Sequence, residues 1–178
     1  DALYRMTSGN VSGSRMDLET FVQRYYLERI LYAANRRFQE MSAGQFELRM
    51  YDLKKAGEGK NRGLDLMVYS TVTGKEREVR TLSGGESFMA ALSLALGMAD
   101  QIQESSAAIN LDMMFIDEGF GTLDPDTLEL AMETLVQLQS SGRLIGMISH
   151  VPELKTRIPA HLEVTRGDDG STAKFVIN

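Results

Sequence analysis

Cysteine is absent from the 178 residues, which excludes disulfides and cysteine-ligated metal sites and fits a reducing compartment, so we expect a cytoplasmic protein. No apolar run approaches the roughly 20 residues of a membrane-spanning helix, and no signal peptide is recognisable, so we expect no membrane contact. Basic excess is also lacking, since the net charge is −6. Modules that grip nucleic acid over a wide face are usually basic, so these residues by themselves are a poor candidate for that role.

A phosphate-binding loop of the form GxxxxGK[ST] is missing as well. The dipeptides at 59–60 and 74–75 are both Gly-Lys, but Asn61 and Glu76 follow them, so neither has the required hydroxyl or spacing. The backbone amides and the lysine of such a loop cradle the phosphates of a nucleotide. By itself, this chain therefore lacks the commonest structural element that binds a nucleotide.

The length suits one domain, and we interpret residues 1–178 as a single lobe. Residues 1–15 are polar and glycine-containing and are expected to be a flexible lead-in, 16–42 a long helix, and 43–178 an α/β unit. The chain begins with Asp1 rather than methionine, so we expect it to be a piece of a longer protein.

The expected long helix carries an apolar stripe at spacings of three and four residues: Leu27, Leu31, Ala34, Phe38 and Met41. The stripe predicts a core-facing side; the alternative is the end of a coiled coil that starts earlier. Its arginines are Arg24, Arg29, Arg36 and Arg37. They form either a solvated face or a ridge that faces DNA.

Alternating and continuous apolar patterns predict the elements that follow. Strands are expected at 46–51, 64–70 and 144–149, with a hairpin of 161–166 and 172–177 about a turn at 168–170. Residues 76–81 are expected to be either a short polar strand or an extended lead-in to the next motif. A basic loop is expected at 54–63, and helices at 84–103, 125–139 and 152–157. The first of these helices is apolar on nearly all sides, which is typical of a helix buried in a larger assembly.

The central stretch is 113–124, MMFIDEGFGTLD. Its apolar start predicts a short buried strand, and Asp117 and Glu118 follow where open α/β sheets place ligands. One acid can hold Mg²⁺ while the other orients or deprotonates a water. The alternative is a strand end that simply turns into solvent. Asp124 is placed to cap a helix that starts at Pro125.

Residues 82–86, LSGGE, allow two interpretations. Ser83 and Glu86 have the spacing of a capping box at a helix start. Gly84 and Gly85 are poor helix formers, and in the first turn they leave backbone amides open to an anion, which favours a phosphate contact.

Two histidines complete the candidate set. His150 follows the strand at 144–149, where it is either a structural residue or part of the same site as the two acids. No motif surrounds His161, which is expected at the surface.

Taken in order, these motifs resemble the ABC-type ATPase series of signature motif, Walker B acids, D-loop and switch histidine. The form DEGFGTLD, with glycine rather than proline after the acids, and ISHV at 148–151 resemble the SbcC family, the SMC-like ATPase subunits of a bacterial nuclease. The resemblance runs from residue 21 to His150 and is weak beyond Pro159.

The resemblance implies the α/β fold of the C-terminal lobe of an ATPase head, with a mostly parallel sheet flanked by helices and a long N-terminal helix continuing a coiled coil. It implies that Asp117 helps to bind Mg²⁺, that Glu118 polarises the attacking water and that His150 contacts the γ-phosphate. It also implies a set that meets an ATP held by an opposite head: Ser83, Gly84, Gly85 and Glu86, with Asp124 in the D-loop.

The same resemblance implies an ATPase of DNA repair and recombination, inactive without an N-terminal lobe that brings the Walker A loop. Its expected partners are that lobe, a second head in an ATP-dependent homodimer, an SbcD-like nuclease subunit and double-stranded DNA. Two alternatives stay open: an SMC- or RecF-like structural ATPase without a nuclease partner, and a non-catalytic regulatory lobe.

Overall fold

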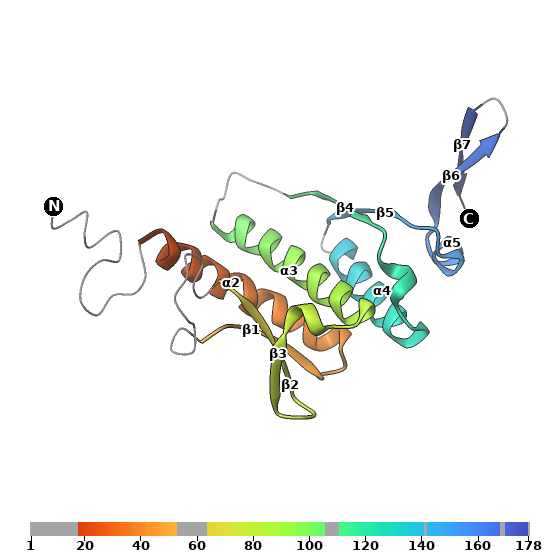
Figure 1. Ribbon diagram of the computed structural model, residues 1–178. Coiled ribbons are helices and arrows are strands. Elements are labelled where there is room, and N and C mark those ends of the chain that lie inside the picture. Colours follow the sequence, from red (N-terminus) through yellow and green to blue (C-terminus); the bar gives the residue numbers. More distant parts are fainter. Residues whose placement is uncertain (1–17, 53–63, 106–110, 141, 168–169, 178) are drawn as a thin grey trace, which may run out of the picture.

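The computed structural model describes residues 18–52, 64–105, 111–140, 142–167 and 170–177 (Figure 1). In chain order its elements are α2 (Leu18–Met41), β1 (Phe46–Met50), β2 (Leu66–Ser70), β3 (Lys75–Glu78), η1 (Val79–Thr81), α3 (Gly84–Ser105), β4 (Met113–Asp117), η2 (Phe120–Thr122), α4 (Pro125–Ser140), β5 (Leu144–Ile148), α5 (Pro152–Arg157), β6 (Ala160–Gly167) and β7 (Gly170–Ile177). The expected lead-in 1–15, the basic loop 54–63 and the turn residues 168 and 169 lie outside the described residues. The expected helices and strands are otherwise found, except that 79–81 form a short 3-10 helix instead of extending a strand.

The core forms where α3 packs along α2, with α4 against α2 as well (Figure 1). Four members of the apolar stripe on α2 are buried and Leu27 is partly buried, which confirms the core-facing interpretation. The expectation for α3 needs a correction. Most of its circumference is covered by other described residues, and its exposed apolar side chains are a narrow strip of Ala91, Ala95 and Met98. The other exposed residues of the helix lie toward its two ends: Gly84, Ser87, Glu104 and Ser105.

The first sheet is antiparallel, in the order β1-β2-β3. It is tied to α2 by the side chain of Asn35. The Asn35 amide nitrogen donates to the carbonyl oxygen of Leu48 at 2.8 Å, and the N–H of Leu48 donates to Oδ1 of Asn35 at 2.7 Å. Both backbone groups of a buried strand residue are thereby satisfied by one side chain, which sets how β1 sits on the helix.

The second sheet is the parallel pair β4 and β5, in which Asp117 lies opposite Ile148. We expected both strands to be buried, and this is wrong for the described residues. Ile116 on one face is buried, whereas the other face is exposed, with Phe115 70% accessible. The remaining large apolar side chains of that face are Met113, Leu144 and Ile148. The sequence of both strands is apolar because a buried parallel strand is apolar on two faces, but the described residues cover only one of these faces.

The last two strands form an antiparallel hairpin that extends beyond α5 (Figure 1). The expected α/β class is confirmed, and within the described residues the parallel part is the β4–β5 pair. None of the helices described in the structure is long and apolar enough to cross a membrane.

Candidate functional site

Two acids lie at the carboxyl end of β4, and the second of them contacts a histidine that follows β5. Asp117 is the last residue of β4, and Glu118 follows it. Oε2 of Glu118 lies 2.9 Å from Nδ1 of His150, a residue 32 positions later in the chain, and both side chains are at least half exposed. An ionised carboxylate can only accept hydrogen bonds, so Nδ1–H of His150 is the donor. Because the two strands are parallel, their ends bring these side chains together.

The backbone turns sharply directly after β4. Glu118 has a φ of 57° and Gly119 a φ of 96°, so two successive residues adopt left-handed conformations. That region is rare for a residue other than glycine and marks a conformation that the surroundings must hold in place. Part of this support is a hydrogen bond from the N–H of Glu118 to the carbonyl oxygen of Ile148, at 2.9 Å.

The start of α3 is a capping box. The N–H of Ser83 donates to Oε2 of Glu86 at 2.7 Å, and the N–H of Glu86 donates to Oγ of Ser83 at 3.3 Å. Arg77 adds a hydrogen bond of 2.9 Å to the other oxygen of Glu86. Burial alone would raise the pKa of Glu86, but the hydrogen bonds from Ser83 and the positive charge of Arg77 outweigh it and bring the pKa below its ordinary value. Glu86 is therefore held as an ionised anchor.

Gly84 and Gly85 lie against η2. This packing explains why glycine stands at both positions, and we did not predict it from the sequence. A Cβ at Gly84 would lie 3.3 Å from Cβ of Thr122, and one at Gly85 would lie 3.2 Å from the carbonyl oxygen of Thr122. Both distances are tighter than ordinary contacts, so a larger residue would push η2 away. The two sequence interpretations are compatible, because the capping box uses the amides of Ser83 and Glu86, while those of Gly84 and Gly85 have no intrahelical acceptor.

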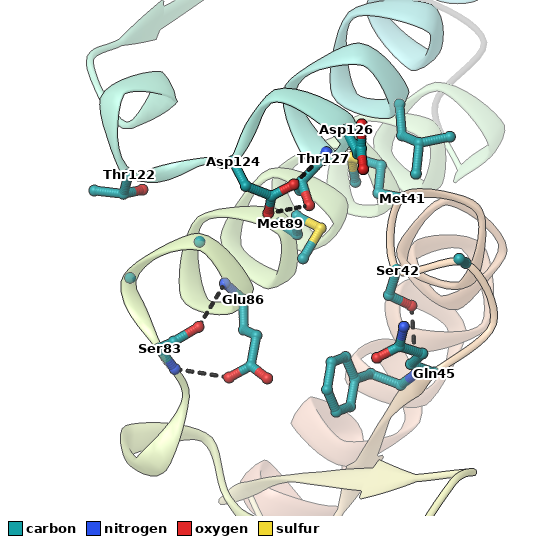
Figure 2. Close-up of a pocket in the computed structure, with 15 residues that line it drawn as sticks. Met41, Ser42, Gln45, Ser83, Glu86, Met89, Thr122, Asp124, Asp126 and Thr127 are labelled. Carbon is teal, nitrogen blue, oxygen red and sulfur yellow. Dashed lines mark hydrogen bonds between the residues drawn. The ribbon is translucent and has the colours of Figure 1, made fainter.

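Asp124 caps α4, as expected. Its carboxylate accepts the N–H of Thr127 at 3.0 Å and the hydroxyl of Thr127 at 2.7 Å. These bonds, that of the hydroxyl first, lower the pKa of Asp124. Asp124 and the start of α3 face one another across a groove of about 610 Å³, whose floor includes Met41 and Met89 (Figure 2).

The structure thus sorts the predicted site residues into two groups. The signature group lines the groove and comprises Ser83, Gly84, Gly85 and Glu86, with Asp124 opposite. The acid–histidine group comprises Asp117, Glu118 and His150, and it lies outside the groove lining. Arg77 and Thr122 were missed by sequence reasoning, because their contacts join a strand or turn to a helix and leave no periodic pattern.

Two of the α2 arginines that we singled out form contacts within the described fold, and His161 lies in a hairpin strand. Arg37 pairs with Asp100 of α3 at 2.7 Å, and Nε of Arg29 donates to the side chain of Gln101 at 2.8 Å. These two arginines are thus engaged with α3, and a ridge that faces DNA stays an untested prediction. His161 is half-buried on β6, with an enclosed Nδ1, and is not the surface residue that we expected.

The donor set can be compared with the needs of the implied ligands. No group of three or more histidine, aspartate or glutamate side chains in the described ranges is placed to hold a metal ion. Mg²⁺ often keeps several waters and is held by one or two carboxylates together with substrate phosphates. A single exposed carboxylate at Asp117 fits that pattern, and the start of α3 fits an anionic group.

Comparison with known proteins finds a family model that matches the middle of the chain and relatives that match most of it. A model of the "SbcC/RAD50-like, Walker B motif" matches residues 62–137. The SbcC subunit of the SbcCD nuclease is 48% identical over 165 residues in Vibrio cholerae and 46% identical over 176 residues in Staphylococcus haemolyticus. These matches cover 93% and 99% of this chain but only 16% and 17% of the relatives, so the chain spans about a sixth of their length.

Solved structures share the fold at low sequence identity. A chain from work on "ATP-driven dimerization and DNA stimulated activation of SMC ATPases" has a TM-score of 0.63 at 17% identity, over 88% of this chain and 89% of its own. The Smc head domain of Pyrococcus furiosus has a TM-score of 0.62 at 16% identity, over 89% of this chain and 37% of its own. The fold is therefore that of SMC ATPase heads. Residues 62–137 match the SbcC/RAD50-like Walker B model, and over the sixth of the SbcC subunits that it spans, this chain is 46% to 48% identical to them.

Proposed function

We propose that this chain is the C-terminal half of an ATP-hydrolysing head, a single lobe whose residues 43–178 follow the end of a coiled coil. One observation carries the proposal. The carboxylate of Glu118 and the imidazole of His150 meet at 2.9 Å, with Asp117 one residue earlier, at the carboxyl ends of two parallel strands. This is where α/β sheets bind ligands, and a carboxylate beside a histidine can orient a water and take its proton.

In this proposal each side chain has one task. Mg²⁺, when bound with ATP, supplies positive charge that offsets the charge of the phosphates. Asp117 would hold it, directly or through water. Glu118 accepts a proton from the attacking water, and His150 contacts the γ-phosphate. A neutral imidazole has only one N–H, so His150 can donate to Glu118 through Nδ1 and to a phosphate through Nε2 at the same time only when doubly protonated.

The signature group acts on a second nucleotide. Ser83 and the amides of Gly84 and Gly85 would contact the γ-phosphate of an ATP held by an opposite head. The positive end of the α3 dipole favours that anion. Glu86 is committed to Ser83 and Arg77, so it would hold the shape of this turn rather than touch the nucleotide. Asp124 would lie in the D-loop, beside the junction of the two heads.

The uncovered face of the parallel pair points to the missing half. Phe115 is 70% exposed, and a contiguous apolar surface of this kind usually meets another protein layer. We propose that an N-terminal lobe covers it and contributes the Walker A loop that residues 1–178 lack.

The proposed task of the whole protein is ATP-driven head pairing that regulates how an SbcD-like nuclease subunit processes double-stranded DNA in the cytoplasm. An SMC- or RecF-like structural ATPase without a nuclease is the second candidate. The curated relatives favour the first, because the SbcC subunits of SbcCD nucleases are 46% and 48% identical, against 16% and 17% for SMC heads. A non-catalytic regulatory lobe is the third candidate.

The test is Glu118→Gln in the complete protein. The amide keeps the size of the side chain but removes the base, so ATP should still bind while single-turnover hydrolysis falls on the order of 10²-fold or more. Heads should then stay paired in ATP, as measured by light scattering. Turnover close to that of the unaltered protein would exclude Glu118 as the base and favour a non-catalytic lobe.

A further inference from the structure

The two groups of site residues touch at one place, the contact between Phe88 and Gly119. Phe88 lies in α3, directly after the signature turn, and Gly119 follows Glu118. A Cβ built on Gly119 would lie 2.2 Å and 2.3 Å from two carbon atoms of the Phe88 ring. No side chain fits at that distance. The ring therefore occupies the space that only glycine leaves free.

The contact is part of a packed unit. The Phe88 ring also meets the ring of Phe120 edge-on, with centroids 4.9 Å apart and planes at 62°. Phe120 is only 1% exposed, so η2 is anchored in the core at this point. Together with the close approach of Gly85 to Thr122, this packs the first turns of α3 tightly against η2, so a shift of one displaces the other.

Glu118 depends on this unit for its direction. Its φ of 57° is unfavourable for a residue with a side chain, so its surroundings must maintain it. On its carboxyl side the neighbour is Gly119, whose conformation is limited by the Phe88 ring. A shift of the ring would change the path of the backbone at Gly119, and with it the aim of the Glu118 carboxylate toward His150.

We propose that Phe88 is a positioning residue that links the signature turn to the catalytic carboxylate of the same lobe. Engagement of Ser83, Gly84 and Gly85 with a nucleotide on the opposite head sets α3, and Phe88 passes that position to Gly119 and so to Glu118. This inference rests on the proposed function above. It adds a structural route by which pairing with another head changes the rate of hydrolysis in this lobe. Phe88 itself touches no nucleotide.

The test uses the complete protein and two readouts, ATP-dependent head pairing and single-turnover hydrolysis. Phe88→Leu keeps an apolar side chain but loses the flat ring beside Gly119. We expect hydrolysis to fall on the order of tenfold while the dissociation constant for pairing changes by less than about threefold. Leu94→Ala is the control, because Leu94 is a partly buried residue of the same helix and lies well beyond the signature turn.

A glycine pair tests the same contact from the other side. Gly119→Ala places a methyl group against the ring, whereas Gly142→Ala places one at a similar φ, 94° against 96°, where no described atom lies within 4 Å. Both variants place an alanine at a similar positive φ. Only Gly119→Ala should lose hydrolysis, and adding Phe88→Ala to it should recover part of the loss, because the methyl group then has room.

Three results would overturn the inference. The first is hydrolysis by Phe88→Leu equal to that of Leu94→Ala. The second is an equal loss of pairing and hydrolysis, which would mean that α3 is merely weakened. The third is strictly multiplicative losses in the Phe88→Ala, Gly119→Ala double variant. Equal turnover of Glu118→Gln and the unaltered protein in the same assay would instead reject the proposed function.

Discussion

The guanidinium of Arg77 donates a hydrogen bond of 2.9 Å to Oε1 of Glu86, while Oε2 of the same carboxylate accepts the N–H of Ser83. Arg77 also donates to the carbonyl oxygen of Thr81 at 2.9 Å, and its guanidinium lies 5.4 Å from the centre of the Phe46 ring. Arg77 thereby ties strand β3 of the antiparallel sheet to the first turn of α3. The shape of the signature turn is thus a property of two elements, β3 and α3.

The first prediction concerns the pH dependence of stability through Glu86. Its folded pKa lies below the ordinary value, so its stabilising contribution is present at neutral pH and is lost as the pH falls through the folded pKa. Glu86→Gln should therefore have a lower unfolding free energy than the unaltered chain at neutral pH. The difference between the two should become smaller as the pH is lowered from about 7 to about 3. Chemical denaturation at several pH values measures it.

The control for Glu86 is Glu133→Gln, which removes an exposed carboxylate from α4. Its stability difference over the same range is the baseline for removing an exposed carboxylate. A difference for Glu86→Gln with no greater pH dependence than this baseline would mean that the Arg77–Glu86 contact adds no pH-dependent stability.

The second prediction concerns Ser83→Arg in the complete protein. A bulky cation at the start of α3 would block the close approach of a phosphate to Gly84 and Gly85. We expect the lobe to fold but ATP-dependent pairing to be lost, as measured by light scattering with a slowly hydrolysed ATP analogue. Ser83→Ala separates the two roles of this residue, because it removes the cap, at about 1 kcal/mol, without filling the space. Pairing that persists in Ser83→Arg would leave the capping box as the only role.

The third prediction concerns the link between α2 and β1. Asn35→Ala leaves both backbone groups of the buried Leu48 without their partners, so it should lower the unfolding free energy by about 1–3 kcal/mol. Gln39→Ala, at an exposed position of the same helix, should change it by less than about 0.5 kcal/mol. Denaturant titration of both variants makes the comparison. Equal effects would show that the Asn35 bridge contributes nothing specific.

The fourth prediction concerns this chain alone. Its proposed contacts to a nucleotide are a few exposed groups at one helix start and one carboxylate, each worth about 1 kcal/mol net. Even millimolar binding needs about 4 kcal/mol beyond the cost of association. We expect titration calorimetry to find no binding of Mg-ATP tighter than millimolar, and no hydrolysis, until the N-terminal lobe is added. Micromolar binding by the chain alone would contradict the half-site proposal.

Local chemistry determined much of this protein from the sequence alone. A few neighbouring residues determine each local feature, because helix periodicity and capping act over one or two turns. These features are the stripe on α2, the cap at Asp124, the capping box at Ser83 and the turn after Asp117. The order of the motifs also pointed to the family. None of this depends on knowing which elements pack together.

The tertiary structure alone decided which distant groups meet. Glu118 reaches His150 because β4 and β5 pair in parallel, and the Phe88 ring meets Gly119 because η2 packs on α3. Arg77 of β3 reaches Glu86 of α3 across the short η1 that separates them in the chain. It also decided that the described part of the chain leaves one face of the parallel pair open, although the sequence of both strands predicts burial. The physical reason is that an apolar pattern predicts burial of a strand face but does not say which residues bury it. Only the folded structure shows whether those residues come from the same chain.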